Sequence, residues 1–285
     1  MPPRRSSTRL GGSLQGGCEF TRQNLANTAW AFAKAGHAAP ALFGAIGKES
    51  VGRMDEFKPQ ELTNTASAFA KAGHAAPALF DAIGKECSGR VREFNSQALA
   101  NTAWAFATAG HAAPALFDAI GMESAGRVHE FVPQALTNTA WAFATAGHAA
   151  PALFDAIGME STGRMHEFVP QALAITAWAF ATAGHAAPAL FDAIGKESAG
   201  RVREFTPQNL ANTAWAFAKA GHAAPTLFNQ HFARRCNALA DEFGVENLRQ
   251  LHQWHMWYTG EHAGSDGLPS AALLACCKAS FRTSG

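Results

Sequence analysis

The sequence predicts an all-α protein, an α-solenoid of tandem 37-residue helix–turn–helix hairpins. The first observation is a phenylalanine that recurs every 37 residues without insertion, at Phe20, Phe57, Phe94, Phe131, Phe168 and Phe205. The second is near-identity, because the units beginning at Phe94 and Phe131 differ at only five positions. A fixed period of about 20–50 residues is typical of solenoids, propellers and arrays. The third observation, apolar residues at helical rather than alternating spacing, argues against a propeller.

The first helix of a unit is clearest in the unit that begins at Phe131. Pro133 suits the first helical position, where the N–H that proline lacks would be unpaired anyway. The apolar residues that follow share one helical face: Leu136, Ala140, Phe143 and Ala144. Gly147 suits the position just past a helix end. We therefore expect a helix over residues 133–146.

The second helix is expected over residues 151–166, after a short turn at 148–150. Pro151 begins it, and apolar residues at helical spacing continue the pattern. Gly158 and Gly163 lie inside it, each costing about 1 kcal/mol relative to alanine, so a kink or break is expected near Gly163. Two such short helices cannot bury their apolar faces alone, so neighbouring units must stack.

Three segments follow from this pattern. Residues 1–18 contain three arginines and no acidic residue, and are expected to be a disordered basic tail with a weak likeness to a transit peptide. Residues 19–241 hold six 37-residue repeats. Residues 242–285 are expected to form a divergent seventh hairpin that caps the array, with helices near 245–258 and 268–281 and a loop at 262–266.

Composition excludes several classes of protein. With 23 basic and 22 acidic residues, the formal net charge is only +1, which excludes binding by bulk positive charge. Every apolar stretch is interrupted before the roughly 18 residues typical of a membrane span. Five scattered cysteines without a CxxC motif favour a reducing compartment over a disulfide framework, and predict no cysteine-based zinc site.

An enzyme is not expected. Catalysis needs a unique constellation, whereas nearly every titratable residue is copied from unit to unit, and no phosphate loop or nucleophile elbow is present. Six histidines directly follow the first-helix glycine and are interpreted as polar turn residues: His37, His74, His111, His148, His185 and His222. His252, His255 and His262 lack partners at metal-ligand spacing, so we expect no metal and no cofactor.

The second helices carry charges that are expected to satisfy one another on a solvated outer face. Glutamate precedes arginine by four residues at Glu49–Arg53, Glu86–Arg90, Glu123–Arg127, Glu160–Arg164 and Glu197–Arg201. Asp81–Lys85 and Asp192–Lys196 have the same favourable orientation.

The first helices carry a different polar stripe. At 100° per residue, Gln134, Asn138, Trp141 and Thr145 lie opposite the Leu/Phe face. The candidate RNA-binding residues are Asn27, Lys34, Asn64, Lys71, Asn101, Thr108, Asn138, Thr145, Thr182, Asn212 and Lys219. Ile175 and Ser67 interrupt the asparagine and tryptophan series. Amides, aromatic rings and lysines together suit a single-stranded nucleic-acid track. The alternative is structural: tryptophan packs between units and asparagine bonds the next helix.

Charge on these helices supports the track. Between each helix start and its glycine, five basic residues (Arg22, Lys34, Lys58, Lys71 and Lys219) stand against Glu61 alone. A nearly neutral protein thereby concentrates positive charge on one side.

The block "PQALTNTAWAFATAGH…PALFDAI" resembles the octotricopeptide/heptatricopeptide class of helical-hairpin repeats, and the segment "NLRQLHQWHMWY…GLPSAALLACCKASF" resembles the region after such repeats in algal proteins similar to chloroplast translation factors. The resemblance covers about residues 19–281 and implies organellar RNA binding, with the first-helix polar residues facing the RNA. Family members often end in a RAP domain, which this sequence lacks.

Three hypotheses follow for function. The first is a single-stranded RNA binder acting on chloroplast or mitochondrial transcripts, in their stability, processing or translation, with proteins of a ribonucleoprotein complex as further partners and no membrane. Its place would be the stroma or the matrix, or the cytoplasm if the N-terminus is complete. The second is a protein-interaction scaffold, a common use of α-solenoids. The third is a recently duplicated fragment without activity.

Overall fold

The fold is all-α, and the chain forms the repeating helix pairs that the sequence predicts. A computed structural model describes residues 20–261 and 268–282; the predicted tail at 1–18, the loop at 262–266 and His262 lie outside these ranges. The first helices of the pairs are α1 (Arg22–Lys34), α3 (Pro59–Ala72), α5 (Ser96–Ala109), α7 (Pro133–Ala146), α9 (Pro170–Ala183), α11 (Pro207–Ala220) and α13 (Val245–Glu261). The second helices are α2 (Pro40–Val51), α4 (Pro77–Gly89), α6 (Pro114–Gly126), α8 (Pro151–Gly163), α10 (Pro188–Arg201), α12 (Gln230–Ala238) and α14 (Ala271–Arg282).

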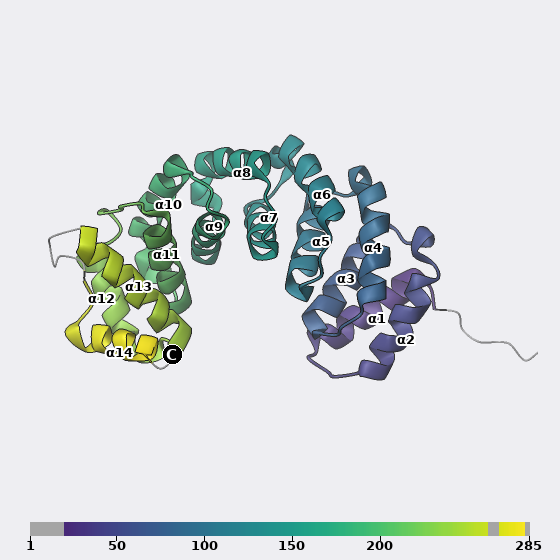
Figure 1. Ribbon diagram of the computed structural model, residues 1–285, viewed down its shortest axis with the longest axis horizontal. Coiled ribbons are helices and arrows are strands. Elements are labelled where there is room, and N and C mark those ends of the chain that lie inside the picture. Colours follow the sequence, from purple (N-terminus) through teal and green to yellow (C-terminus); the bar gives the residue numbers. More distant parts are fainter. Residues whose placement is uncertain (1–19, 262–267, 283–285) are drawn as a thin grey trace, which may run out of the picture.

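The helix pairs stack side by side into an arch of two layers (Figure 1). The odd-numbered helices pack in succession, each against the next, and line the concave side of the arch. The even-numbered helices form the convex row (Figure 1). This two-row stack is the α-solenoid expected from the 37-residue period.

Helix ends follow the local chemistry of the sequence. Proline occupies the first turn of α7, and Gly110 after α5 adopts φ +62°. The Gly110 N–H donates to the Ala107 carbonyl oxygen and the His111 N–H to that of Phe106, at 3.2 and 3.1 Å. These two bonds form a Schellman motif, in which glycine tolerates the left-handed conformation. The expected first helix, 133–146, is confirmed as α7.

The second helix ends earlier than expected. α8 stops at Gly163, and a 3₁₀ turn over Met165–Glu167 replaces its last residues. The expected break near Gly163 is therefore confirmed. Equivalent turns are η1 (Met54–Glu56), η2 (Val91–Glu93), η3 (Val128–Glu130), η5 (Val202–Glu204) and η6 (Ala240–Glu242).

The interior glycine of the second helix has a packing role that the sequence did not reveal. A Cβ placed on Gly121 would lie 3.3 Å from the ring of Phe143 in the next unit. Phe143 is fully buried and meets Phe117 edge to face, with ring centroids 5.0 Å apart. The glycine lowers the stability of its own helix, but its missing side chain leaves a slot between units that an aromatic ring fills. The same Phe–Phe contact recurs at Phe43–Phe69, Phe80–Phe106, Phe154–Phe180 and Phe191–Phe217.

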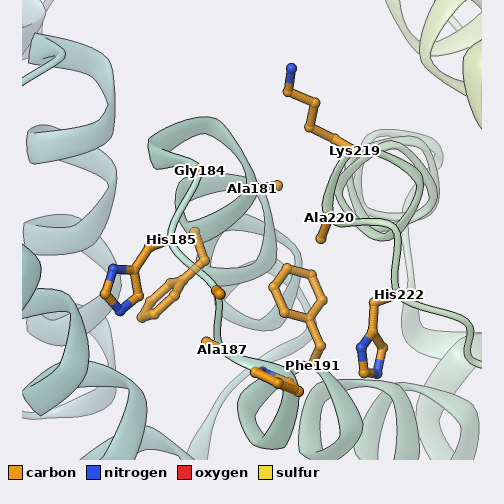
Figure 2. A pocket seen from close by; sticks show the side chains of 11 residues that line it. Ala181, Gly184, His185, Ala187, Phe191, Lys219, Ala220 and His222 are labelled. Carbon is orange, nitrogen blue, oxygen red and sulfur yellow. The ribbon is translucent and has the colours of Figure 1, made fainter.

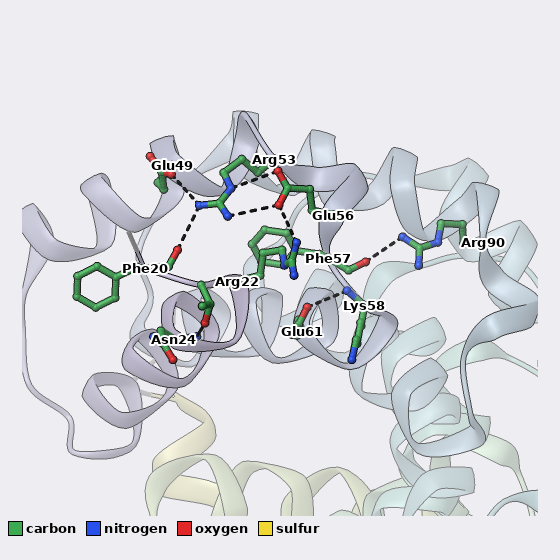
Figure 3. A network of polar contacts seen from close by, with 11 residues as sticks. Phe20, Arg22, Asn24, Glu49, Arg53, Glu56, Phe57, Lys58, Glu61 and Arg90 are labelled. Atoms are coloured by element: carbon green, nitrogen blue, oxygen red, sulfur yellow. Dashed lines mark hydrogen bonds and ion pairs between the residues drawn. The ribbon is translucent and has the colours of Figure 1, made fainter. Parts of the chain in front are cut away.

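An arginine at the end of each second helix ties the unit together. Arg90 Nη1 donates to the Phe57 carbonyl oxygen at 2.9 Å and to Glu86 at 2.9 Å, while Nη2 donates to Glu93 at 2.8 Å (Figure 3 shows the first contact). The predicted Glu–Arg pairs are confirmed in all five units. The arginines also donate to backbone carbonyl oxygens at the start of their own units, so these side chains stabilise the fold as well as facing solvent.

The histidines and aspartates link successive units. His111 Nε2 lies 2.9 Å from Asp81 Oδ1, and its ring packs 5.5 Å from that of Phe80. The same ion-pair contact recurs at Asp118–His148, Asp155–His185 and Asp192–His222. The expected Asp81–Lys85 and Asp192–Lys196 pairs were wrong: no such ion pair forms among the described residues, because the aspartates face histidine instead.

The last two hairpins depart from the repeat. After Pro225 the chain forms a turn, and α12 begins only at Gln230, where Asn229 caps it. Arg235 Nη2 donates to the Phe205 carbonyl oxygen at 2.9 Å. Arg90 makes the equivalent contact with the Phe57 carbonyl oxygen in the second unit. α13 packs against both α11 and α14, and its Trp254 is fully buried against Phe228.

Candidate nucleic-acid interface

The predicted polar stripe lies on the concave row of helices. Three asparagines of this row differ in exposure: Asn27 is exposed, and Asn101 and Asn138 are half-buried. The tryptophans and the Lys/Thr positions follow at the next turns of the same helices. The helices α1, α5, α7 and α11 thus present an amide, an aromatic ring and a small polar or basic group in order along the axis. We call the residues at these positions the concave stripe; α3 lacks the ring and α9 lacks the amide.

The asparagines of the concave stripe fall into two groups. Among the described residues, no hydrogen bond engages the side chains of Asn101 and Asn138. Asn64, in contrast, accepts from Gln60 Nε2 at 2.9 Å, and Asn212 accepts from Gln250 Nε2 at 3.0 Å. The structural role weighed for asparagine therefore applies at Asn212, which holds α13 against α11, whereas the central asparagines have unused amides.

The tryptophans combine packing with exposure. Trp104, Trp141, Trp178 and Trp215 are partly buried and pack against the core. Trp30, at the first unit, is 40% exposed. Ser67 leaves one step of the series without a ring, and its side chain is buried. Packing between units is therefore one role of these rings, and the remaining exposed edge of each is the part that can meet a ligand.

The Lys/Thr positions lie at one rim of the arch, beside hollows formed by the turns. A hollow of about 440 Å³ is lined by Lys71 and His74, and one of about 240 Å³ by Lys219 and His222. In Figure 2, Lys219 extends away from the aromatic rings of its hollow, with its ammonium group free of them. Thr108 and Thr145 occupy the same place in two further hollows. These four hollows repeat one concavity along the rim.

Charge along the concave row is weaker than the residue count suggests. Arg22 is paired with Glu56 at 2.7 Å (Figure 3), so it is not a free cation. Lys34, Lys71 and Lys219 are exposed and lie in the last turn of their helices, where a cation also complements the helix dipole. The free positive charge is thus at the two ends of the arch, with threonines between.

No reactive centre emerges from the described part of the chain. No group of three or more His, Cys, Asp or Glu side chains there is placed to hold a metal ion. Burial raises the pKa of Cys87 to about 12 and that of Cys277 to about 11, so both thiols are protonated at neutral pH. Across residues 20–261 and 268–282, every helix is too short or too polar to cross a bilayer.

Two residues of the concave face escaped the sequence argument. Gln250 and Gln253 come from α13, and they contact Asn212 and the indole N–H of Trp215. The repeat with one residue inserted before Phe243 locates them, because they lie 38 residues after the asparagine and the tryptophan that they contact. A search for those two residue types misses them, since glutamine replaces both in α13.

These features define a helical-repeat protein with a polar concave face. The chain belongs to the RNA-editing substrate-binding complex 6 protein family, whose pattern it matches over residues 20–254. That family is mitochondrial and named for the complex that binds the substrates of RNA editing, which ties the chain to organellar RNA processing. No curated protein matches the chain significantly. The octotricopeptide resemblance is thus supported only at the level of organellar helical-repeat proteins, and the chloroplast and translation expectations are unsupported.

Proposed function

We propose that the concave stripe binds single-stranded RNA in the mitochondrial matrix, as a non-catalytic subunit of an RNA-processing complex. The observation that carries the proposal is a contrast between two sets of side chains. The amides of Asn101 and Asn138 on the concave row pair with no other described residue, whereas the arginine at the end of a convex helix, such as Arg127, contacts two glutamates and a backbone carbonyl. Unused amides can bond base edges, and the half-exposed tryptophans offer stacking surfaces. Family membership supplies the RNA-processing context.

The helical geometry favours bases over phosphates as the groups that meet the stripe. The part of the rim that carries Thr108 and Thr145 is formed by helix C-termini without a lysine, whose partial negative charge does not favour an anion. We therefore assign sequence-tolerant base contacts to the Asn, Trp and Thr positions, and phosphate contacts to Lys34, Lys71 and Lys219. Six similar units favour a nearly uniform tract, with Ile175 and Ser67 marking the steps that differ.

The test is fluorescence anisotropy of the full chain with labelled single-stranded RNA, single-stranded DNA and duplex RNA, at two salt concentrations. The proposal predicts salt-dependent binding to single-stranded RNA and weaker binding to duplex. Asn101→Ala with Asn138→Ala should weaken RNA binding without lowering the unfolding midpoint, because these side chains form no hydrogen bond with the described part of the chain. Asn212→Ala is the matched control, and it should lower the unfolding midpoint because Gln250 loses its partner.

A protein scaffold is the second candidate function, and one observation favours it. Met122 and Met159 are 77% and 80% exposed on the convex helices α6 and α8. Exposed methionines suit adaptable protein contacts. If the folded chain binds no single-stranded RNA at micromolar concentration, the scaffold role becomes the leading one.

A further inference from the structure

A pocket of about 640 Å³ opens at the C-terminal end of the concave row, where α9 and α11 meet α13 and α14. Its lining includes Trp178, Thr182, Trp215, Gln250 and Gln253. The first three belong to repeated positions, whereas the two glutamines come from the divergent helix α13. The combination therefore occurs once in the part of the chain that the structure describes.

The aromatic wall of this pocket is held in place. The rings of Trp178 and Trp215 stack with centroids 6.3 Å apart and planes inclined by 30°. Trp215 Nε1 donates a hydrogen bond to Gln253 Oε1 at 2.6 Å. This hydrogen bond to a residue of α13 fixes the orientation of the Trp215 indole. The two stacked tryptophans are therefore a preorganised surface for a further flat ring from a ligand.

The pocket also has polar atoms without partners. Thr182 Oγ1 and Gln250 Oε1 are both buried and make no hydrogen bond with any other described residue. One N–H of the Gln250 amide donates to Asn212, which leaves the oxygen of this side chain as its unpaired buried atom. Buried polar atoms are nearly always paired in folded proteins, and two unpaired ones on residues that line one pocket suit a ligand with a donor.

Charge in the lining selects the kind of ligand. Arg249 is paired with Glu246, and its Nε donates to the Ser280 carbonyl oxygen at 3.1 Å. The carboxylate of Glu246 offsets the charge of Arg249, so the site suits a neutral group better than a phosphate. A neutral, planar ring with an N–H donor at its edge fits all three features of the pocket.

We propose that this pocket holds one unstacked nucleobase of the bound RNA, with an indole face against the ring and Gln250 Oε1 accepting from the base edge. The inference rests on the proposed function and adds one place at which the position of the RNA along the arch is fixed. Similar units alone allow an RNA to slide from one register to the next. A single distinct base site at one end sets the register and the polarity of the strand.

The test is a double-mutant cycle between an RNA lacking one base and the pocket. An abasic residue is moved along the shortest RNA that binds with full affinity, and each RNA is titrated with the wild type and with Trp215→Ala. At one position, loss of the base should weaken wild-type binding about 5- to 150-fold, the usual range for one stacked base. Trp215→Ala should weaken the intact RNA similarly and the abasic RNA no further.

Two further variants are controls, one for unfolding of the chain and one for the loss of any tryptophan from the concave row. Thr182→Val keeps the shape of the side chain and removes only its hydroxyl, so it should weaken the intact RNA while the unfolding midpoint is unchanged. Trp104→Ala removes the equivalent ring two units before Trp178 and should not couple to the same RNA position. If the losses in binding free energy from the abasic residue and from Trp215→Ala simply add at every RNA position, the pocket proposal is overturned, while the RNA-binding function stands.

A second readout separates the two proposals. If no RNA binds, the proposed function fails, and titration with each nucleoside monophosphate tests the pocket alone. A base-dependent change in tryptophan fluorescence that is lost in Trp215→Ala and Thr182→Val would support the pocket. An identical response from the wild type and both variants would overturn it.

Discussion

The convex and concave rows of the arch are built from the same units, yet they treat polar side chains in opposite ways. On the convex side, Arg127 contacts Glu123, Glu130 and the Phe94 carbonyl oxygen. On the concave side, Asn138 has no hydrogen bond within the described residues. A paired polar group of this kind holds the stack together, whereas an unpaired and half-exposed one at a repeated position is open to a ligand. Hydrogen-bond pairing and exposure, more than charge, are therefore the basis on which we propose the concave stripe as the binding surface.

The largest expected effect is on the apolar contact between the rows. Phe143→Ala should destabilise the chain by about 3–5 kcal/mol, because the ring is fully buried against Phe117 and fills the slot at Gly121. Chemical denaturation followed by circular dichroism measures the change. Met122→Ala, at an exposed site in the same region, is the control and should stay within about 0.5 kcal/mol. A loss below about 1 kcal/mol for Phe143→Ala would contradict the packing account.

A smaller loss is expected from the convex arginines. Arg127→Ala removes three charge-assisted contacts of a side chain that is only 26% exposed, and should cost about 1–2 kcal/mol. RNA affinity should not change, because this residue is on the opposite row from the concave stripe. Arg92→Ala is the control, since Arg92 is exposed and forms no ion pair with any described residue. Equal effects of the two variants on stability would refute the structural role of Arg127.

The same contacts predict a response to acid. Hydrogen bonds from arginine hold the pKa of Glu93, Glu130 and Glu167 below the usual range. Because the folded-state pKa is lower than the unfolded one, near 4.3, this stability is present above that pH and is lost as pH falls through the folded pKa. The unfolding midpoint should therefore decline below about pH 4. Glu130→Gln should flatten the decline, and a decline that is unchanged in this variant would argue against the assignment.

The smallest effect is expected at a buried serine. Ser161 is fully buried and its hydroxyl has no partner among the residues that the structure describes, whereas the same position in the second unit is Cys87. Ser161→Ala should therefore leave stability unchanged or raise it by up to about 1 kcal/mol, because an unpaired hydroxyl is removed from the core. Thermal unfolding measures the change, with Thr139→Ala as a contrast, since Thr139 donates to the Ala135 carbonyl oxygen. A clear loss at Ser161→Ala would reveal a partner that the account lacks.

The sequence predicted the fold closely because the repeat carries its own signals. Pro133 at the helix start and Gly147 just past the helix end gave the bounds of α7, and the Glu–Arg spacing gave the convex pairs. The partners of Asp81 and His111 were not predictable, because they are 30 residues apart and meet only when units stack. The slot role of Gly121 was missed for the same reason, since its partner ring belongs to the next unit.

The candidate site was predictable only in part. Helical periodicity put the asparagine, tryptophan and Lys/Thr positions on one stripe, and the structure places that stripe on the concave row. Periodicity did not show that Asn212 is engaged by Gln250 or that Arg22 is paired with Glu56. The first contact depends on a side chain of the divergent helix α13, and the second on a residue at the far end of the same unit.

The most direct test of the central claim compares two matched sets of lysines. Lys34, Lys71 and Lys219 end concave helices, whereas Lys48, Lys85 and Lys196 are exposed on convex helices. Changing either set to glutamine removes the same charge, and each triple variant is titrated with labelled single-stranded RNA over a range of salt. The account predicts weaker binding and a shallower salt dependence, by about 0.7 in log–log slope per lost phosphate contact, for the concave set alone. Equal losses from both sets would show that the RNA does not distinguish the two rows, and would contradict the account.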